Sequence, residues 1–186
     1  HVLNVGDPST PTETGHIGLP GYAVQVDVVW PYAYVADYGA GLQVIRVNVA
    51  PPVPAGAWDT PGLAYGVAAS GDYAYVADFG SGLQVIDVSN PAAPTAAGTF
   101  DTQGLAWDVA VAGDFAYVAD YYDGLRILDV SEPAVPEEVA FYDTPDLAYG
   151  VALAGDSVYV ADGSGGMFIL SGAKRVYLPV VVRSYP

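Results

Sequence analysis

The sequence contains no cysteine, two histidines, one methionine and only five lysine or arginine residues. The absence of cysteine excludes disulfides and thiolate metal sites, but a chain of 186 residues buries enough apolar surface to fold without them. The scarcity of basic residues, set against 21 acidic ones, gives a formal charge of −16. Because binding to phosphate backbones needs lysine and arginine, we expect no nucleic-acid partner.

Long apolar runs are also missing. No stretch approaches the roughly 18 apolar residues that span a bilayer, and the run "VYLPVVV" at 176–182 is short and contains Pro179. We therefore predict no membrane span. No signal peptide is recognisable, and because the sequence begins at His1 rather than methionine, we expect a processed, mature chain.

Apolar residues are abundant, at 52%, and are accompanied by 22 glycines, 15 prolines and 15 tyrosines. Valine and tyrosine favour pleated strands, whereas glycine and proline mark turns. Successive copies of one phrase begin 41 or 42 residues apart, and a fixed period of this length is typical of a solenoid, propeller or array. The four copies are "YVADYGAGLQVI" from Tyr34, "YVADFGSGLQVI" from Tyr75, "YVADYYDGLRIL" from Tyr117 and "YVADGSGGMFIL" from Tyr159.

Each period divides into four predicted strands, which in the second full copy cover 64–70, 73–78, 82–88 and 95–101. The dipeptide Gly71-Asp72 joins the first two, since glycine supplies the positive φ of a tight hairpin turn. The apolar runs are nearly continuous rather than alternating, which indicates that both faces of each sheet are covered. Four antiparallel strands per repeat, covered on both faces, predict an all-β fold of the β-propeller type.

Two segments resemble a known repeat. "GDYAYVAD" at 71–78 and "GLQVIDVSNP" at 82–91 are similar to the LVIVD repeat family of exported or surface proteins from bacteria and archaea. The likeness extends in four copies from Val2 to about residue 170, with departures at "VNVAPP" and "MFILSG". It implies a β-propeller of four to five blades in an extracellular or cell-surface protein, and it implies no catalytic residue.

The repeat boundaries predict one propeller domain over 1–172, with a partial blade at 1–20 and blades at 21–60, 61–102, 103–144 and 145–172. The first segment supplies only the third and fourth strands of a blade. In one alternative, this half blade pairs with the first two strands of the last copy and closes a four-bladed ring. In the other, the last blade completes itself and the half blade stays open for another chain. A third alternative is that the sequence is part of a longer propeller.

Residues 173–186 form a basic, apolar tail. All 21 acidic residues lie at or before Asp162, so residues 1–172 carry a formal charge of −19 and the tail carries +3. Such a tail either packs on its own last blade or adds as a strand to a neighbouring copy. We expect a non-enzymatic extracellular structural protein whose copies link through terminal strands into a homo-oligomer or a filament. The expected contact residues are Arg175, Val176, Tyr177, Leu178, Val180, Val181, Val182 and Arg183.

Residue patterns that support catalysis are scarce. The sequence has no nucleophile-elbow serine, no phosphate-binding glycine–lysine loop and no histidine-based metal spacing, so we predict no enzymatic activity and no cofactor. His16 aligns with the strand residues Ala57 and Thr99, which favours a surface or packing role. The repeated carboxylates, which are candidates for Ca²⁺, lack the dense Asp-x-Asp spacing of a calcium loop. The alternative, which we favour, is that each accepts backbone N–H groups in its own turn. These residues are Asp37, Asp78, Asp120 and Asp162.

Positions that break the repeat are the better candidates for a ligand site, because a single site must break the symmetry. Asp108 stands in a column that holds glycine in two other copies, and Gln25 lies in the same column. Tyr121 and Tyr122 enlarge the turn of the third copy, and aromatic rings suit sugars. These four residues are the candidate patch for an alternative function, a propeller that binds a glycan or a protein through its blade-top loops. Ordinary loop variation is the other explanation.

Overall fold

The computed structural model describes residues 2–171, which form five antiparallel sheets in chain order. An N-terminal ribbon contains β1 (Val2–Asn4) and β2 (Thr12–Gly15). Blade 1 contains β3 (Gln25–Val29), β4 (Tyr32–Ala36), β5 (Leu42–Arg46) and β6 (Val53–Trp58). Blade 2 contains β7 (Gly66–Ser70), β8 (Tyr73–Ala77), β9 (Leu83–Asp87) and β10 (Thr95–Phe100). Blade 3 contains β11 (Asp108–Ala112), β12 (Phe115–Ala119), β13 (Leu125–Asp129) and β14 (Glu137–Tyr142). Blade 4 contains β15 (Ala148–Ala154), β16 (Ser157–Asp162), a 3₁₀ turn at Gly163–Gly165 and β17 (Gly166–Ser171).

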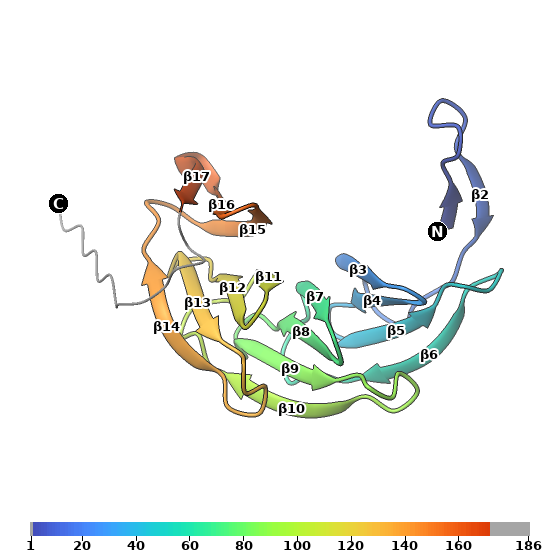
Figure 1. Cartoon of the computed structure of the whole chain (residues 1–186), viewed down its shortest axis with the longest axis horizontal. Coiled ribbons are helices and arrows are strands. Elements are labelled where there is room, and N and C mark those ends of the chain that lie inside the picture. The colour runs from blue at the N-terminus through green and yellow to red at the C-terminus, as the bar shows by residue number, and fades with distance from the viewer. Residues whose placement is uncertain (1, 172–186) are drawn as a thin grey trace.

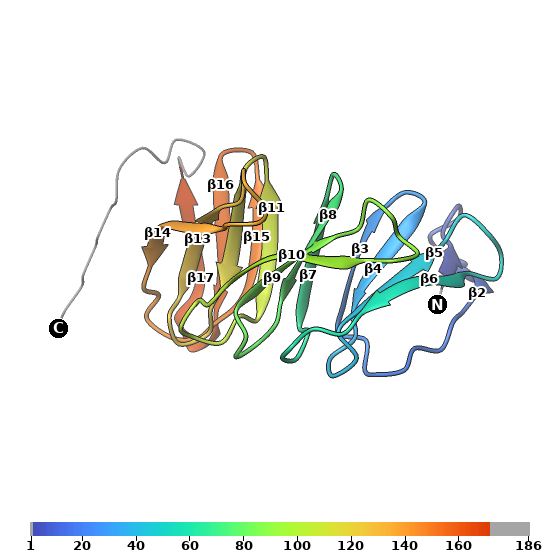
Figure 2. The ribbon, with the colours of Figure 1, turned by 90° about the horizontal axis from the view of Figure 1, so that it is seen from below.

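The predicted all-β architecture of four-stranded propeller blades is confirmed. In blades 1 to 3 the strands pair in chain order, so the first and fourth strands form the two edges of each sheet. Figure 1 shows the blades side by side in an arc, with β3, β7, β11 and β15 on its inner side and β6, β10 and β14 on its outer side. Each inner strand contacts the inner strand of the next blade. Figure 2 shows the same row of blades from below.

The turn between the second and third strands explains the repeated phrase. The residue after the repeated aspartate has a positive φ, of 50° at Tyr38, 51° at Phe79 and 52° at Tyr121. Its backbone forms a bridge to an alanine at or just before the start of the inner strand of the next blade, as Phe79 does with Ala106. Each turn therefore joins two blades as well as two strands.

The hydrophobic core consists of one layer of side chains at each junction between blades. At the first junction, Tyr34, Leu42 and Val44 of blade 1 share a cluster with Val67, Val76 and Ile86 of blade 2. The same sequence columns meet between blades 2 and 3 and between blades 3 and 4. Each face of a blade presents its own set of apolar repeat positions. A blade therefore needs a neighbour on each side to bury both of its faces.

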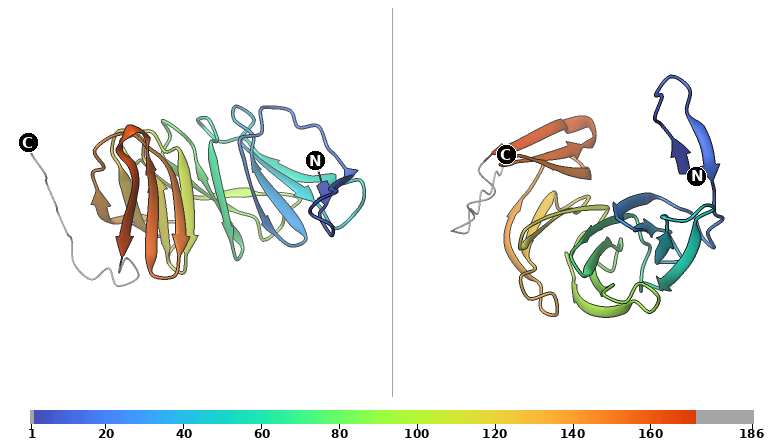
Figure 3. Two further views of the ribbon diagram at one scale, coloured as in Figure 1. Left: turned by 90° about the horizontal axis from the view of Figure 1, so that it is seen from above. Right: turned by 45° about the vertical axis from the view of Figure 1, so that its right-hand side comes forward.

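The two ends of the arc stay apart. The ribbon β1–β2 is a sheet of its own, and blade 4 has three strands among the described residues. In the right panel of Figure 3, the ribbon and blade 4 lie at opposite ends of an open arc. The chain by itself therefore does not adopt the first alternative, a ring closed by pairing its N-terminal strands with β15 and β16. Residues 2–171 include no helix long and apolar enough to cross a membrane.

Candidate functional site

The repeated aspartates are buried at the ends of the second strands, where they hold the loops that enter their blades. Asp78 accepts a hydrogen bond from Thr60 Oγ1 at 2.5 Å and another from the Gly62 backbone N–H at 2.7 Å. Asp120 accepts the equivalent hydrogen bond from Thr102 Oγ1 at 2.5 Å. Because Thr60 and Thr102 follow the outer strand of the preceding blade, each carboxylate fixes a connection between two blades.

The first and last of these aspartates keep only part of the arrangement. Asp37 accepts a hydrogen bond from the Gly21 backbone at 2.9 Å. Leu19 stands where the middle blades have threonine, and Asp37 Oδ1 has no hydrogen-bond partner among the described residues. Asp162 accepts a hydrogen bond from the Asp146 backbone at 3.1 Å. The four carboxylates lie in four different blades, and residues 2–171 contain no group of three acidic or histidine side chains placed to hold a metal ion.

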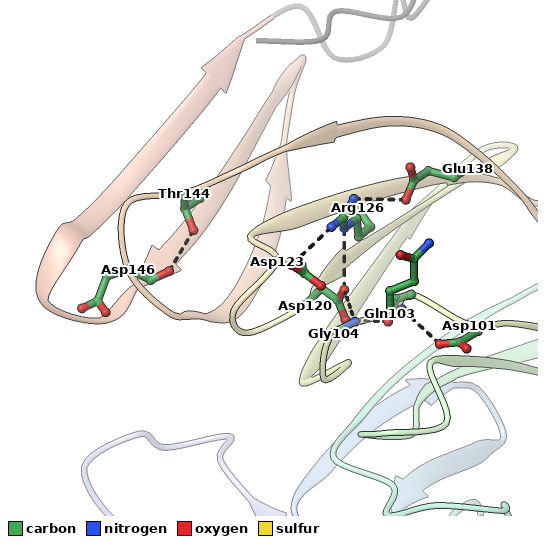
Figure 4. Close-up of polar contacts among 10 residues, drawn as sticks. Asp101, Gln103, Gly104, Asp120, Asp123, Arg126, Glu138, Thr144 and Asp146 are labelled. Carbon is green, nitrogen blue, oxygen red and sulfur yellow. Dashed lines mark hydrogen bonds and ion pairs between the residues drawn. The ribbon is translucent and has the colours of Figure 1, made fainter. Parts of the chain in front are cut away.

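Blade 3 adds a charged cluster around its aspartate, drawn in Figure 4. The Arg126 guanidinium lies 3.6 Å from Asp120 Oδ2, 3.6 Å from Asp123 Oδ1 and 3.5 Å from Glu138 Oε2. Burial raises the pKa of the Asp120 carboxyl to about 7, and the charge of Asp123 acts in the same direction. The hydrogen bond from Thr102 and the charge of Arg126 oppose that rise.

Arg126 was not predicted as a site residue, although it breaks the repeat by replacing a glutamine. Gln43 and Gln84 occupy the same third-strand column in blades 1 and 2. Each glutamine donates a hydrogen bond to a backbone carbonyl of its own turn. The arginine instead joins three carboxylates and lies 5.0 Å from the centre of the Phe141 ring. The Asp120 side chain is fully buried, whereas Asp123 and Glu138 at the rim of the cluster are partly exposed.

The candidate residues Gln25 and Asp108 are brought together on the inner strands. Gln25 Nε2 donates to Asp108 Oδ1 at 2.8 Å, and Gln25 Oε1 accepts from the Val67 backbone on β7. Asp108 also accepts from the Val151 backbone on β15 at 2.9 Å. Burial raises the pKa of Asp108, and the hydrogen bonds it accepts oppose that rise. Two side chains therefore join the inner strands of all four blades.

Aromatic rings form a continuous row across the blade junctions. The centroids of neighbouring rings lie 4.3–5.9 Å apart, and Trp107 stacks on Tyr121 at 5.2 Å. Tyr122, at the end of the row, is exposed and makes an edge contact with Tyr121 at 4.3 Å. We call this set the aromatic row, and its members are Tyr38, Tyr65, Phe79, Trp107, Tyr121, Tyr122 and Tyr149.

The remaining predicted positions lie at the N-terminal end of the arc or outside the described residues. His16 Nδ1 lies 2.9 Å from Glu13 Oε1, next to β2, and the His16 side chain is exposed. The tail residues expected to contact a neighbour lie outside residues 2–171. They are Arg175, Val176, Tyr177, Leu178, Val180, Val181, Val182 and Arg183.

At the two end faces of the arc, some apolar side chains are exposed although the residues at the same position of the other repeats are buried between blades. On blade 1, 58% of Val26 is exposed, whereas the equivalent Val67 and Val109 are buried. On blade 4, 63% of Met167 and 53% of Ile169 are exposed, whereas blades 1 to 3 bury both columns. The buried equivalents of Met167 are Leu42, Leu83 and Leu125, and those of Ile169 are Val44, Val85 and Ile127.

An apolar groove lies over the end face of blade 1, with a volume of about 560 Å³. It is lined by Val26, Val35 and Ile45 of blade 1, and also by Ile17 and the ribbon residue Val2. The groove is therefore placed where the core layer of a further junction would lie.

Comparison with known proteins agrees with this architecture. The family model described as LVIVD repeat matches residues 20–52, 61–102, 103–144 and 147–170. No curated protein matches the chain.

Solved structures with a similar fold include two designed proteins and one bacterial protein. The computationally designed Ika8 protein has a TM-score of 0.67 at 6% identity, over 81% of this chain and 46% of its own. The designed Ika4 protein has a TM-score of 0.68 at 5% identity, over 86% and 98%. BamB from Moraxella catarrhalis has a TM-score of 0.63 at 12% identity, over 80% and 44%. The chain thus spans a little under half the length of Ika8 and of BamB.

Proposed function

The chain belongs to the LVIVD repeat family, and from that premise we propose that it is a non-enzymatic propeller module whose copies associate through their end blades. We place it outside the cell or at the cell surface, in line with the exported repeat proteins that its sequence resembles. Within such an assembly the chain is a structural building block, and a ring and a filament are both products of end-to-end contact.

The observation that carries this proposal is the exposure of Val26, Met167 and Ile169 at the two end faces. Full burial of such a side chain contributes about 1.5–3 kcal/mol, so contact with another copy would remove a large apolar area from water. A contiguous apolar face on a soluble protein is typical of an interaction surface.

The edge of β17 supports the same proposal. Among the described residues, β17 pairs with β16 on one side and with no strand on the other, whereas the third strands of blades 1 to 3 each have a fourth-strand partner. Unpaired edges are templates for strand addition by another chain. In the proposal the basic tail adds charge complementarity, because residues 1–172 carry −19 and the tail carries +3.

The non-enzymatic part of the proposal is supported by the surroundings of the carboxylates. A hydrolase needs an accessible acid, base or nucleophile. The pKa of Asp120 is raised to about 7 by burial, but its side chain is fully buried. The inner pair Gln25 and Asp108 is engaged in hydrogen bonds between blades.

Light scattering over a range of protein concentrations tests the proposal. We expect the chain, with a monomer mass of 19.2 kDa, to form larger species, and we expect deletion of residues 173–186 to weaken them. Since charge complementarity is screened by salt, the effect of the deletion should shrink at high ionic strength. A monodisperse species of 19.2 kDa at every concentration would contradict the proposal.

A second candidate function, binding of a glycan, is favoured by the exposed end of the aromatic row. Tyr122 is exposed, and its ring lies against Tyr121, so the pair presents an aromatic surface beside a blade-top turn. Such surfaces stack on sugars. A glycan array probed with the chain and with its Tyr121→Ala, Tyr122→Ala variant tests this function, which requires binding by the former and loss of binding by the latter.

A further inference from the structure

We infer that the two end faces are the two halves of one interface, and that two copies of this chain close head to tail into a ring of eight blades. This inference rests on the proposed self-association, and it names the partner surface and the number of copies. Each end face of one copy would contact the opposite end face of the other copy, in the way that neighbouring blades contact each other at the three junctions inside the chain.

The internal junctions define what such an interface looks like. At each of them the preceding blade contributes a tyrosine, an alanine and two aliphatic columns, as Tyr34, Ala36, Leu42 and Val44 do in blade 1. The blade that follows contributes the columns of Val67, Ala74, Val76 and Ile86. These eight positions hold no charged residue, so packing decides the contact.

The outer face of blade 4 presents the residues that the preceding blade contributes at an internal junction. Its columns read Tyr159, Ala161, Met167 and Ile169, which match the four residues of blade 1 in type and order. The pairing of β16 with β17 also keeps the usual register, since Tyr159 pairs with Ile169 as Tyr75 pairs with Val85. The surface that blade 4 offers is thus the same surface that blades 1 to 3 use internally.

The end face of blade 1 presents the residues that the following blade contributes at an internal junction. Val26, Ala33, Val35 and Ile45 stand in the columns of Val67, Ala74, Val76 and Ile86. All four line the 560 Å³ groove, where Val26 is exposed and the other three are buried with Ile17 and Leu19 packed against them. The apolar side chains of a docked blade 4 would fill this groove, as Leu42 and Val44 fill the equivalent space at the first internal junction.

The N-terminal ribbon marks the outer limit of the docking site. A Cβ added at Gly15 of β2 would lie 2.8 Å from the Pro52 side chain of the next blade. The fourth strand of blade 1 makes the same approach to blade 2, since a Cβ at Gly56 would lie 2.9 Å from the Pro94 side chain. Strand β2 therefore already lies in the place of the fourth strand of a blade that precedes blade 1.

Counting strands shows how the joint blade would be completed. Among residues 2–171 blade 4 has its first three strands, and in the proposal β2 of the second copy pairs with β17 as the fourth. Strands β1 and β17 hold the same position in the repeat, so only one of them fits. Because β17 pairs with β16 at six positions and β1 pairs with β2 at three, we expect β1 to be displaced.

The curvature of the arc favours closure by two copies over an open filament. The chain superposes on a little under half of Ika8 and of BamB with TM-scores of 0.67 and 0.63, and on 98% of Ika4 with a TM-score of 0.68. Its blades are therefore arranged like about half of two longer chains and like the whole of a shorter one. In the proposal the eight blades of two copies complete the ring and return to the starting face. The contact is heterologous, and closure after two copies limits the assembly to a dimer.

Two single substitutions test the pairing of unlike faces. Val26→Asp places a charge on one end face and Met167→Asp on the other, and both side chains are already more than half exposed, so neither change disturbs folding. Each variant alone should associate at least about tenfold more weakly than the unchanged chain. An equimolar mixture should recover a dimer, because one intact pair of faces remains between the two variants.

Val135→Asp is the matched control, since Val135 is also 63% exposed but lies outside both end faces. It should leave the dimer intact, and thermal melts should show all three variants folded. A variant that dimerises alone, or a mixture that stays monomeric, would overturn the inference while leaving self-association itself in place. Long polymers of the unchanged chain would overturn ring closure, and a monomer would overturn the proposed function as well.

Because the chain has no cysteine, a disulfide tests the register of β2 against β17. In blade 2 the equivalent pair is Gln84 and Thr99, whose side chains form a hydrogen bond of 3.0 Å. Mixing a His16→Cys variant with a Phe168→Cys variant under oxidising conditions should give a covalent heterodimer. A dimer that is confirmed by light scattering but does not crosslink in the mixture would overturn the pairing of β2 with β17.

Discussion

At Asp120, burial and a neighbouring arginine act on one carboxyl in opposite directions. Burial dominates and raises the pKa of Asp120 from 3.8 to about 7, although Arg126 lies 3.6 Å away. The folded protein therefore holds this proton more tightly than the unfolded chain does. The stability that the group contributes is complete below about pH 4 and is lost as the pH rises towards 7.

The first prediction concerns the substitution Asp120→Asn, which removes this titration. We expect the free energy of unfolding to fall less steeply between pH 4 and pH 7 than in the unchanged chain, by up to about 1.4 kcal/mol per pH unit. Urea unfolding followed by tryptophan fluorescence at several pH values measures the slope. Identical slopes for the two proteins would contradict the assignment of a raised pKa to Asp120.

Asp87→Asn is a control of opposite sign. Hydrogen bonds from Ser89 lower the pKa of Asp87, so its contribution is present above the ordinary value of 3.8 and is lost as the pH falls. Removing Asp87 should therefore change the unfolding free energy at neutral pH and leave the slope between pH 5 and pH 7 as it is. The comparison separates a buried carboxyl from one in an exposed turn.

Between elements, close backbone contacts hold the outer strands of neighbouring blades together. The pairing of β10 with β9 shifts register between Ala96 and Gly98, which forms a bulge. At Gly98 a Cβ would lie 2.2 Å from the carbonyl oxygen of Pro133 in blade 3. A glycine is needed here because another backbone approaches too closely for any side chain.

The second prediction concerns Gly98→Ala, which we expect to destabilise the protein by roughly 1–3 kcal/mol through overpacking at this contact. For a chain of 186 residues, such a loss lowers the melting temperature by several degrees. Gly18→Ala is the matched control, since no atom lies within 4 Å of a Cβ at that position. A melting temperature unchanged by Gly98→Ala, or lowered equally by both substitutions, would contradict the close contact.

The strands were predictable from the sequence, because the repeat supplies several independent copies of each. The prediction of 73–78 for the second strand of blade 2 differs from β8 (Tyr73–Ala77) by one residue. Of the aromatic row only Tyr121 and Tyr122 were predicted, although Tyr65, Trp107 and Tyr149 share one position of the repeat. Their contacts reach turns of neighbouring blades, and the offset between blades is a tertiary property that spacing along the chain does not encode.

The candidate site was predictable only in part, for a similar reason. Gln25 and Asp108 were recognised as breaks in the repeat, and they do meet, at 2.8 Å. Their partners are backbone N–H groups on β7 and β15, which no residue pattern identifies. Arg126 was missed although Asp120 and Asp123 precede it by six and three residues, and its third carboxylate, Glu138, is twelve residues away on the adjacent strand.

For the whole molecule, stability in a repeat array is the sum of the blades and their junctions. Blades 2 and 3 have a neighbour on both faces, whereas blade 4 has a neighbour on one face among the described residues. The equivalent strands β8, β12 and β16 have nearly the same sequence, so differences in their amide exchange report the junctions rather than the residues.

The third prediction is that these equivalent strands exchange their amide hydrogens at different rates in the Met167→Asp variant. We expect β16 to exchange at least about tenfold faster than β8 and β12, because an end blade opens by losing one junction rather than two. In the unchanged chain, docking of a second copy would supply the missing junction and slow β16 towards the rates of the middle blades. Hydrogen exchange at several protein concentrations measures both effects. If β16 were as protected as β12 in a monomeric variant, the blades would unfold as one cooperative unit, and the end faces would not limit the stability of the arc.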